Sequence, residues 1–297
     1  MRFDYFEPSS VEEAREILRS GDGRYKALAG GTDVILLLRR RVKSYKGLVN
    51  IKRLPDIDAL AAEPGKGLHM GAATLMRKLE TSSVIAERFP SLIDAVKVIG
   101  SIQLRNIATI GGNLCNASPA ADTAPSLIVL GSKVTIANNG SSSQSVPVED
   151  FFAGPGRTVL GPDGLLLSVD VPEPQGMTGD CFERFTPRSA MDIAIASAAS
   201  WVTLDPSSGR VKDVAIALGA VAPTPVCAPK AEDVLRGQEP TPELLAKAGA
   251  LAEGECSPID DIRGTAAYRR AIIAVLVRRT LERSIERAKG GKGKVTR

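Results

Sequence analysis

Two pairs of adjacent glycines, Gly30-Gly31 and Gly111-Gly112, have the residue type and the setting to bind a phosphate group. The first pair follows a predicted strand at 25–29 and precedes a predicted helix at 34–41. Glycine has no Cβ, so backbone N–H groups can approach a phosphate there, and the helix N-terminus adds a partial positive charge. A tight turn at the end of a strand explains the same residues. This segment alone therefore leaves a pyrophosphate cradle and a plain turn open.

The second glycine pair repeats this chemistry about 80 residues later, in the run Thr109-Ile110-Gly111-Gly112-Asn113. Two such loops in one domain could hold one dinucleotide from both sides, with Asn116, Ser118 and Asp122 nearby as donors and acceptors. A polar turn capped by its own Asn and Asp side chains is the alternative. Neither loop is a Rossmann G-x-G-x-x-G motif, and no acidic residue lies suitably downstream to bind a ribose.

The elements that would position these loops begin with alternating strands and helices in the first 50 residues. Ser9-Ser10 followed by Glu12-Glu13 is a helix start with a capping residue and an acidic first turn. Thr32 or Asp33 can cap the second helix, which ends in arginines that favour a helix C-terminus. The expected elements are a helix at 11–19, a strand at 25–29, a helix at 34–41 and a strand at 48–51. Their alternation predicts a βαβ-type lobe.

A second lobe is predicted for the rest of the N-terminal half. Apolar residues from Leu75 to about Gly100 recur at spacings that bury one face of a helix. The other expected elements are a strand at 68–72, a helix at 126–130, a strand at 133–137 and a hairpin-type turn at 138–145.

A proline- and glycine-containing segment, 172–179, has the composition of a domain linker. The elements expected after it are strands at 181–185, 197–204 and 211–218, and helices at 242–253 and 267–287. The turn at 205–209 makes the strands an antiparallel meander. We therefore expect a C-terminal α+β domain with helices packed on one face of an antiparallel sheet.

The composition is that of a soluble globular protein, with 43% hydrophobic and 24% charged residues and a net charge of +4. The basic residues concentrate only in the tail 288–297, which we predict to be disordered and, without stacking aromatics, not to bind nucleic acid. No apolar run approaches the ~20 residues of a transmembrane helix, and the start lacks a secretory signal. The four cysteines form no C-x-x-C pair, so we expect no metal site and a cytoplasmic location.

Candidate catalytic residues are lacking. His69 is the only histidine and stands in a predicted strand outside both glycine loops, which favours a structural or solvated histidine. No Ser/His/Asp or Cys/His arrangement offers a nucleophile, so we predict no catalytic residue in this chain.

Taken together, the residues resemble a known family. Gly30-Gly31-Thr32-Asp33 and the run from Gln103 to Asp122 look like the flavin subunit of molybdenum hydroxylases. This family includes the medium subunit of aerobic carbon monoxide dehydrogenase and the flavin domain of xanthine dehydrogenase. Further matches follow in the family's order at 163–172, 185–194, 219–225 and 267–270. The resemblance covers roughly residues 1 to 285.

The resemblance implies an α+β protein with an N-terminal FAD-binding domain of the vanillyl-alcohol oxidase (PCMH) type in two α/β lobes at 1–175. It also implies a CO dehydrogenase flavoprotein C-terminal-type domain at 178–287, before the tail 288–297. The residues it implies for binding a non-covalent FAD are Leu28, Ala29, Gly30, Gly31, Thr32, Asp33, Val34, Ile99, Thr109, Ile110, Gly111, Gly112, Asn113, Asp122, Leu166 and Arg184.

The resemblance also suggests roles. Residues 28–35 and 109–113 would hold the pyrophosphate and adenosine half, and Ile99 would pack on the adenine or the flavin. Asp122 would hydrogen-bond the cofactor, and Leu166 would line it. Arg184 stands where the family commonly has lysine, and a cation there would favour an anionic reduced flavin. Arginine keeps the charge but changes its geometry.

The implied function is electron transfer in a larger complex. A large subunit would carry molybdopterin, a small subunit would carry [2Fe-2S] clusters, and the complex would be a dimer of heterotrimers. This FAD would then exchange electrons with a terminal acceptor. One alternative is a free-standing flavin oxidase or reductase, which would need a general acid or base that the sequence does not offer. The other is a non-catalytic protein whose glycine loops are only turns.

Overall fold

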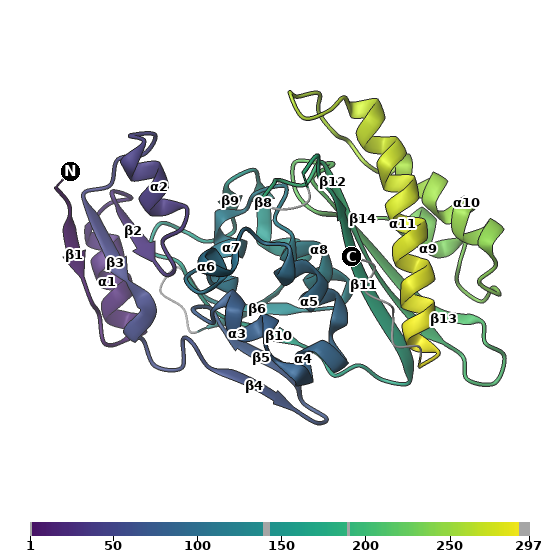
Figure 1. Ribbon diagram of the computed structural model, residues 1–297. Helices are drawn as coiled ribbons and strands as arrows, with labels where there is room; N and C mark the ends of the chain where they lie inside the picture. Colours follow the sequence, from purple (N-terminus) through teal and green to yellow (C-terminus); the bar gives the residue numbers. More distant parts are fainter. Residues whose placement is uncertain (1, 139–142, 189–190, 291–297) are drawn as a thin grey trace.

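The computed structural model of the protein describes residues 2–138, 143–188 and 191–290. The chain is an α+β structure in three parts: a small N-terminal lobe, a central lobe, and a C-terminal sheet covered by helices (Figure 1). We call the first two parts lobe 1 and lobe 2. No helix in the described ranges is both long and apolar enough to cross a bilayer. The fold class expected from the sequence is confirmed.

Lobe 1 is a parallel sheet in the order β1-β3-β2 with two helices. Its elements are β1 (Asp4–Phe6), α1 (Val11–Ser20), β2 (Tyr25–Leu28), α2 (Val34–Arg39) and β3 (Gly47–Asn50). The Glu13 N–H donates to the Ser10 hydroxyl, and the Ser9 N–H donates to the Glu13 carboxylate. The helix therefore begins with the capping arrangement that the sequence predicts.

The start of α2 differs from the expectation. Asp33 occupies the cap position but makes no capping hydrogen bond, and the Thr32 hydroxyl contacts only the Asp33 carboxylate. Asp33 has helical dihedral angles, φ −91° and ψ −50°, whereas a capping side chain needs extended backbone. The capping predicted for Thr32 or Asp33 is wrong.

Lobe 2 is an antiparallel sheet in the order β4-β5-β10-β6-β7, with six helices packed around it. Its elements are η1 (Ile51–Arg53), β4 (Leu60–Glu63), β5 (Gly67–Gly71), α3 (Met76–Glu80), α4 (Ser83–Arg88), α5 (Pro90–Lys97), α6 (Ile102–Arg105), α7 (Ile110–Asn116), α8 (Thr123–Val129), β6 (Lys133–Ala137), β7 (Gln144–Pro147), η2 (Glu149–Phe151), β8 (Phe152–Gly154), β9 (Arg157–Thr158) and β10 (Leu165–Val171).

The predicted hairpin between β6 and β7 is confirmed, and its residues 139–142 lie outside the described part. The central strand β10 was not predicted, because a strand buried on both faces lacks the polar alternation that marks one.

The helical region expected from Leu75 to Gly100 is three short helices, α3, α4 and α5. The Ser82 hydroxyl accepts from the Ile85 N–H and starts α4 anew. Phe89 leaves helical geometry, with φ −136° and ψ 56°, directly before Pro90 begins α5. Proline has no N–H and restricts the preceding residue, so it suits a helix start and ends the helix before it.

The C-terminal part is an antiparallel sheet in the order β11-β12-β13-β14, as the meander predicted. Its elements are β11 (Met177–Phe185), β12 (Ala196–Leu204), β13 (Val211–Gly219), β14 (Val226–Cys227), α9 (Pro229–Asp233), α10 (Pro242–Glu253) and α11 (Ala266–Ala288). Helices α10 and α11 cover the face turned away from the N-terminal lobes (Figure 1). The predicted tail starts too early, because Ala288 still belongs to α11, and residues 291–297 lie outside the described part.

A partly buried ionic network joins lobe 2 to the C-terminal sheet. The Arg287 guanidinium of α11 donates to the Asp94 carboxylate of α5 at 2.8 Å and to the Asp180 carbonyl of β11. The Asp180 carboxylate accepts from the Ser91 N–H of α5. Burial raises the pKa of Asp180 to about 6. One arginine thus compensates carboxylates from two parts of the molecule.

Replacing this arginine tests the interface. Arg287→Met leaves Asp94 and the buried Asp180 without their cation, so we expect the free energy of unfolding to fall by about 2–4 kcal/mol in urea denaturation. The control is Arg278→Met, which breaks an exposed pair with Glu282 on the same helix and should cost less than about 1 kcal/mol. Equal losses in the two variants would contradict a stabilising role for the network.

Candidate functional site

A cleft of about 550 Å³ lies between lobe 1 and lobe 2, a volume within the usual range of ligand sites. We call it the interlobe cleft. The predicted cofactor residues found in its wall are Ala29, Gly30, Gly31, Thr32, Asp33, Val34, Ile99, Thr109, Gly111, Gly112, Asn113 and Leu166. Both glycine segments therefore contribute to one cavity.

The other predicted residues lie behind or beside this wall. Leu28 ends β2 and packs under the first glycine pair, since a Cβ on Gly31 would be 3.0 Å from its Cδ1. Ile110 is completely buried in the core. Asp122 and Arg184 are also buried, and they contact each other instead of lining the cleft.

The first glycine segment carries unpaired backbone donors. The N–H groups of residues 30–34 have no hydrogen-bond acceptor among the described residues, although all five residues line the cleft. Gly31 has φ +76°, a left-handed conformation that favours glycine. Residues 30–32 and 34 are half-buried and Asp33 is exposed, and the first turn of a helix leaves its N–H groups without intrahelical partners, so this segment presents donors that an anion or water can pair.

The second glycine segment differs from the loop expected from the sequence. Gly111 and Gly112 lie in the first turn of α7, which Thr109 caps through its hydroxyl. The Ile110 N–H donates to the Thr74 carbonyl and the Gly111 N–H to the Ala72 carbonyl. The N–H groups of residues 110–113 therefore already donate within the protein. This part of the segment forms the wall of the cleft, and it can bind a ligand mainly through its side chains.

Those side chains include two amides. The Asn113 Oδ1 accepts from the Thr123 hydroxyl at 2.6 Å, which orients its amide nitrogen as a donor in the cleft wall. The Asn116 Nδ2 lies 3.4 Å from the Asp33 Oδ1 and so links α7 to the first glycine segment.

Three cations of the wall were missed by the sequence reading. Lys26, Lys43 and Arg157 line the cleft and form no ion pair within the described residues. Desolvation raises the pKa of the Cys115 thiol to about 12, and the nearby Lys26 charge partly opposes this rise. Asp33 is the only acidic residue among the described lining residues. The cleft therefore favours an anionic ligand.

An apolar surface completes the cleft. Ile99, Leu104, Leu165 and Leu166 line it, and Tyr45 adds a half-buried ring whose pKa is raised by burial. A surface of this kind suits a flat, largely apolar ring.

The predicted residues Asp122 and Arg184 form a buried ion pair. The Arg184 guanidinium, on β11, donates to the Asp122 Oδ2 at 2.7 Å, and both side chains are less than a tenth exposed. Burial raises the pKa of Asp122 to about 6, although Arg184 lowers it. The second oxygen, Oδ1, is buried without any hydrogen-bond partner in the described residues. Buried carboxylate oxygens normally accept a hydrogen bond, so the unpaired Oδ1 has the capacity to accept one from a bound ligand.

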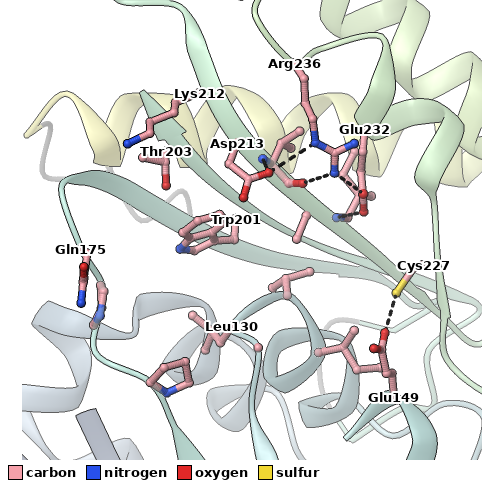
Figure 2. Close-up of a pocket in the computed structure, with 18 of the residues that line it drawn as sticks. Leu130, Glu149, Gln175, Trp201, Thr203, Lys212, Asp213, Cys227, Glu232 and Arg236 are labelled. Atoms are coloured by element: carbon pink, nitrogen blue, oxygen red, sulfur yellow. Dashed lines mark hydrogen bonds and ion pairs between the residues drawn. The ribbon is translucent and has the colours of Figure 1, made fainter. Parts of the chain in front are cut away.

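A second cavity of about 710 Å³ lies between lobe 2 and the C-terminal sheet. Figure 2 shows Trp201 on its sheet side and Leu130 on its lobe 2 side. The Arg236 guanidinium pairs with Asp213 and Glu232 there, so its charge is compensated. Desolvation and nearby Glu149 raise the pKa of the Cys227 thiol to about 12, so this thiol is a weak nucleophile at neutral pH.

His69 lies outside both cavities. Its Nδ1 is 2.6 Å from the Asp170 Oδ1 on the neighbouring strand β10, a cross-strand pair on the sheet of lobe 2. The structural interpretation of this histidine agrees with that position.

Comparison with known proteins decides the family. Residues 1–174 match the family described as FAD binding domain in molybdopterin dehydrogenase, and residues 182–284 match the CO dehydrogenase flavoprotein C-terminal domain. The chain belongs to this family of FAD-binding subunits. The family resemblance inferred from the glycine motifs is confirmed.

Relatives of this FAD-binding subunit match over nearly its whole length. It is 32% identical to the carbon monoxide dehydrogenase medium chain of Afipia carboxidovorans, over 97% of this chain and 98% of the relative. It is also 32% identical to the 6-hydroxypseudooxynicotine dehydrogenase complex subunit alpha of Paenarthrobacter nicotinovorans, over 97% and 96%. A solved carbon monoxide dehydrogenase of Hydrogenophaga pseudoflava lacking the Mo-pyranopterin moiety has a TM-score of 0.91 at 31% identity, covering 97% of this chain and 98% of that one.

The close approach of the lobes in this FAD-binding subunit can be tested at Gly30. A Cβ there would lie 2.2 Å from the Ile107 carbonyl oxygen, so we expect Gly30→Ala to lower the free energy of unfolding by about 1–3 kcal/mol. The matched control is Gly254→Ala, whose nearest neighbour would be 3.4 Å away. Thermal denaturation measures both, and a Gly30→Ala protein as stable as the control would contradict the contact.

Proposed function

We propose that this chain is the FAD-containing electron-transfer subunit of a heteromeric molybdenum hydroxylase. It passes electrons between the [2Fe-2S] clusters of a partner subunit and a terminal acceptor. The observation that carries the proposal is the interlobe cleft, which combines unpaired N–H groups and unpaired cations with an apolar wall in a chain of the flavin-binding family.

The cleft fits the chemistry of FAD. A pyrophosphate carries negative charge, and we assign it to the backbone of residues 30–34 with Lys26, Lys43 and Arg157 as counter-charges. Ile99 and Leu166 belong to the apolar wall and suit a planar ring. Thr109, Asn113 and the helical glycines 111–112 form the opposite wall.

Residues outside the lining act through their neighbours. Leu28 and Ile110 pack under the two glycine segments. Asp122 does not line the cleft, but its Oδ1 is buried without a hydrogen-bond partner and would accept a hydrogen bond from a cofactor that reaches past the lining residues; Arg184 would hold that carboxylate in place as a positioning cation.

Within this role the protein supplies position and electrostatics, and no residue of the chain is catalytic. Bound FAD supplies the exchange between single-electron steps and a two-electron transfer. The free N–H groups orient the phosphates, and the apolar wall excludes water from the ring. The association is non-covalent, since His69 lies outside the cleft and the raised pKa of Cys115 keeps its thiol protonated.

The domain division follows the sheets. We place the FAD-binding domain at 1–175 and the C-terminal domain at 178–287, and the basic tail follows the end of α11 at Ala288. The last strand of lobe 2 ends at Val171 and the next sheet begins at Met177, which supports a boundary between them.

The partners follow from the family to which the chain belongs. We propose a small subunit with [2Fe-2S] clusters and a large subunit with molybdopterin, assembled as a dimer of heterotrimers in the cytoplasm. Relatives named as a medium chain and as a subunit of a dehydrogenase complex support a multi-subunit assembly. Four free thiols among the described residues suit a reducing compartment.

Substitutions in the glycine segments test FAD binding by the full chain. Gly31→Val places a branched side chain at φ +76°, and Gly112→Val places a Cβ 2.8 Å from the Thr109 hydroxyl. We expect each to raise the Kd of FAD about 100-fold or more, equivalent to about 2.8 kcal/mol, in a flavin fluorescence titration.

Gly254→Val at the end of α10 is the control and should bind FAD normally. Circular dichroism confirms that each variant is folded. A folded wild-type chain that never binds FAD would overturn the proposed function. Turnover of a small substrate by the isolated chain would instead favour a free-standing flavin enzyme.

The pH dependence of binding tests Asp122. Burial raises its pKa from 3.8 to about 6, so in the cofactor-free protein its contribution to stability is present at low pH and is lost as the pH rises through this window. A donor on FAD favours the carboxylate, so binding should tighten with rising pH, by up to about tenfold per unit below pH 6.

Asp122→Asn should bind FAD more weakly and with little pH dependence between pH 5 and 7. Asp58→Asn, an exposed carboxylate of the same lobe, should keep the wild-type pH profile. A steep profile retained in Asp122→Asn would assign the titration to another group.

A further inference from the structure

One ion-pair cluster joins the two lobes beside the interlobe cleft. Asp163 accepts from the Arg15 guanidinium at 3.0 Å and from the Arg19 guanidinium at 2.8 Å. Both arginines lie on α1 of lobe 1, whereas Asp163 lies in the turn before β10 of lobe 2. The contact therefore spans the two halves of the cleft and joins residues 144 and 148 positions apart.

The cluster is buried on its inner side. The Asp163 side chain is 10% exposed and the Arg15 side chain is 11% exposed, whereas Arg19 is 58% exposed. Burial raises the pKa of Asp163, but the hydrogen bonds from Arg19 and Arg15 outweigh this and hold the pKa below its usual value. Shielded charges of this kind interact strongly, and removing Asp163 leaves the buried Arg15 without a counter-charge.

The turn that carries Asp163 is directly connected to the wall of the cleft. Leu160 and Gly164 flank it and line the cleft, and Leu165 and Leu166 continue the wall along β10. A displacement of this turn relative to α1 would therefore move the apolar wall away from the first glycine segment of lobe 1.

We propose that Asp163 is a positioning residue that holds the two lobes at the separation required to bind FAD. The inference rests on the proposed function, because it assumes that FAD is the ligand that spans the cleft. Without the ion pairs, the lobes spend less time at the binding-competent separation, and the apparent Kd rises in proportion to the competent fraction that is lost.

The test uses the full chain and a flavin fluorescence titration at low salt. We expect Asp163→Asn and Arg15→Gln each to raise the Kd of FAD by about tenfold or more. The double variant should be no worse than Asp163→Asn alone, because that substitution already breaks the contact with Arg15. Arg19→Lys keeps a charge near Asp163 and should retain most of the affinity.

A matched control is Lys66→Gln, which breaks a pair with Glu63 in the β4–β5 hairpin of lobe 2, within a single lobe. It should leave the Kd unchanged. Thermal denaturation of every variant separates a loss of fold from a loss of lobe positioning.

The outcomes separate the two proposals. If the wild-type chain binds no FAD, the proposed function fails. If the wild-type chain binds FAD and folded Asp163→Asn binds it equally well, the positioning role is overturned while the proposed function stands. Additive effects of Asp163→Asn and Arg15→Gln would likewise overturn an action through their mutual contact.

Discussion

The backbone contact between Gly30 of lobe 1 and the Ile107 carbonyl of lobe 2 is the constraint on which the cleft depends. A side chain at Gly30 would collide with that oxygen at 2.2 Å, so the lobes reach this separation only with glycine there. Gly111 meets the Ala72 carbonyl in a similar way and fixes α7 against the end of β5. The first contact joins residues 77 positions apart and the second joins residues 39 positions apart, and together they fix the walls of the cleft.

The two glycine pairs consequently have different roles, although the sequence makes them look alike. In the second pair, α7 uses the small residues for packing, and its first N–H groups already donate to Ala72, Thr74 and Thr109. The first pair follows strand β2, and the N–H groups of residues 30–34 have no hydrogen-bond acceptor in the described part of the chain. These residues are half-buried or exposed, so water reaches their N–H groups, and an anionic ligand would replace that water as the hydrogen-bond acceptor.

Local patterns predicted most of the elements and much of the cleft wall, because strands, helices and glycine turns have short-range signals. The boundaries of α10 and β6 match the predicted ones. The strand β10 was missed because a strand buried on both faces has no polar alternation. Lys43 and Arg157 were missed because an exposed cation in a sequence looks like any other surface residue. Their grouping is a consequence of tertiary structure, which brings Arg157 of β9 in lobe 2 and Lys43 of lobe 1 into the wall of one cleft.

The ion pair of Asp122 and Arg184 changes how the C-terminal domain takes part. The sequence suggested a cation acting directly on the flavin, but the guanidinium on β11 is compensated by a carboxylate at the start of α8. A cation in such a pair influences a ligand mainly through its partner, because the two opposite charges largely cancel at a distance. The unpaired Oδ1 of Asp122 is then the atom of this ion pair that can still accept a hydrogen bond. The C-terminal sheet thereby sets the orientation and charge of one carboxylate in lobe 2, although none of its described residues lines the interlobe cleft.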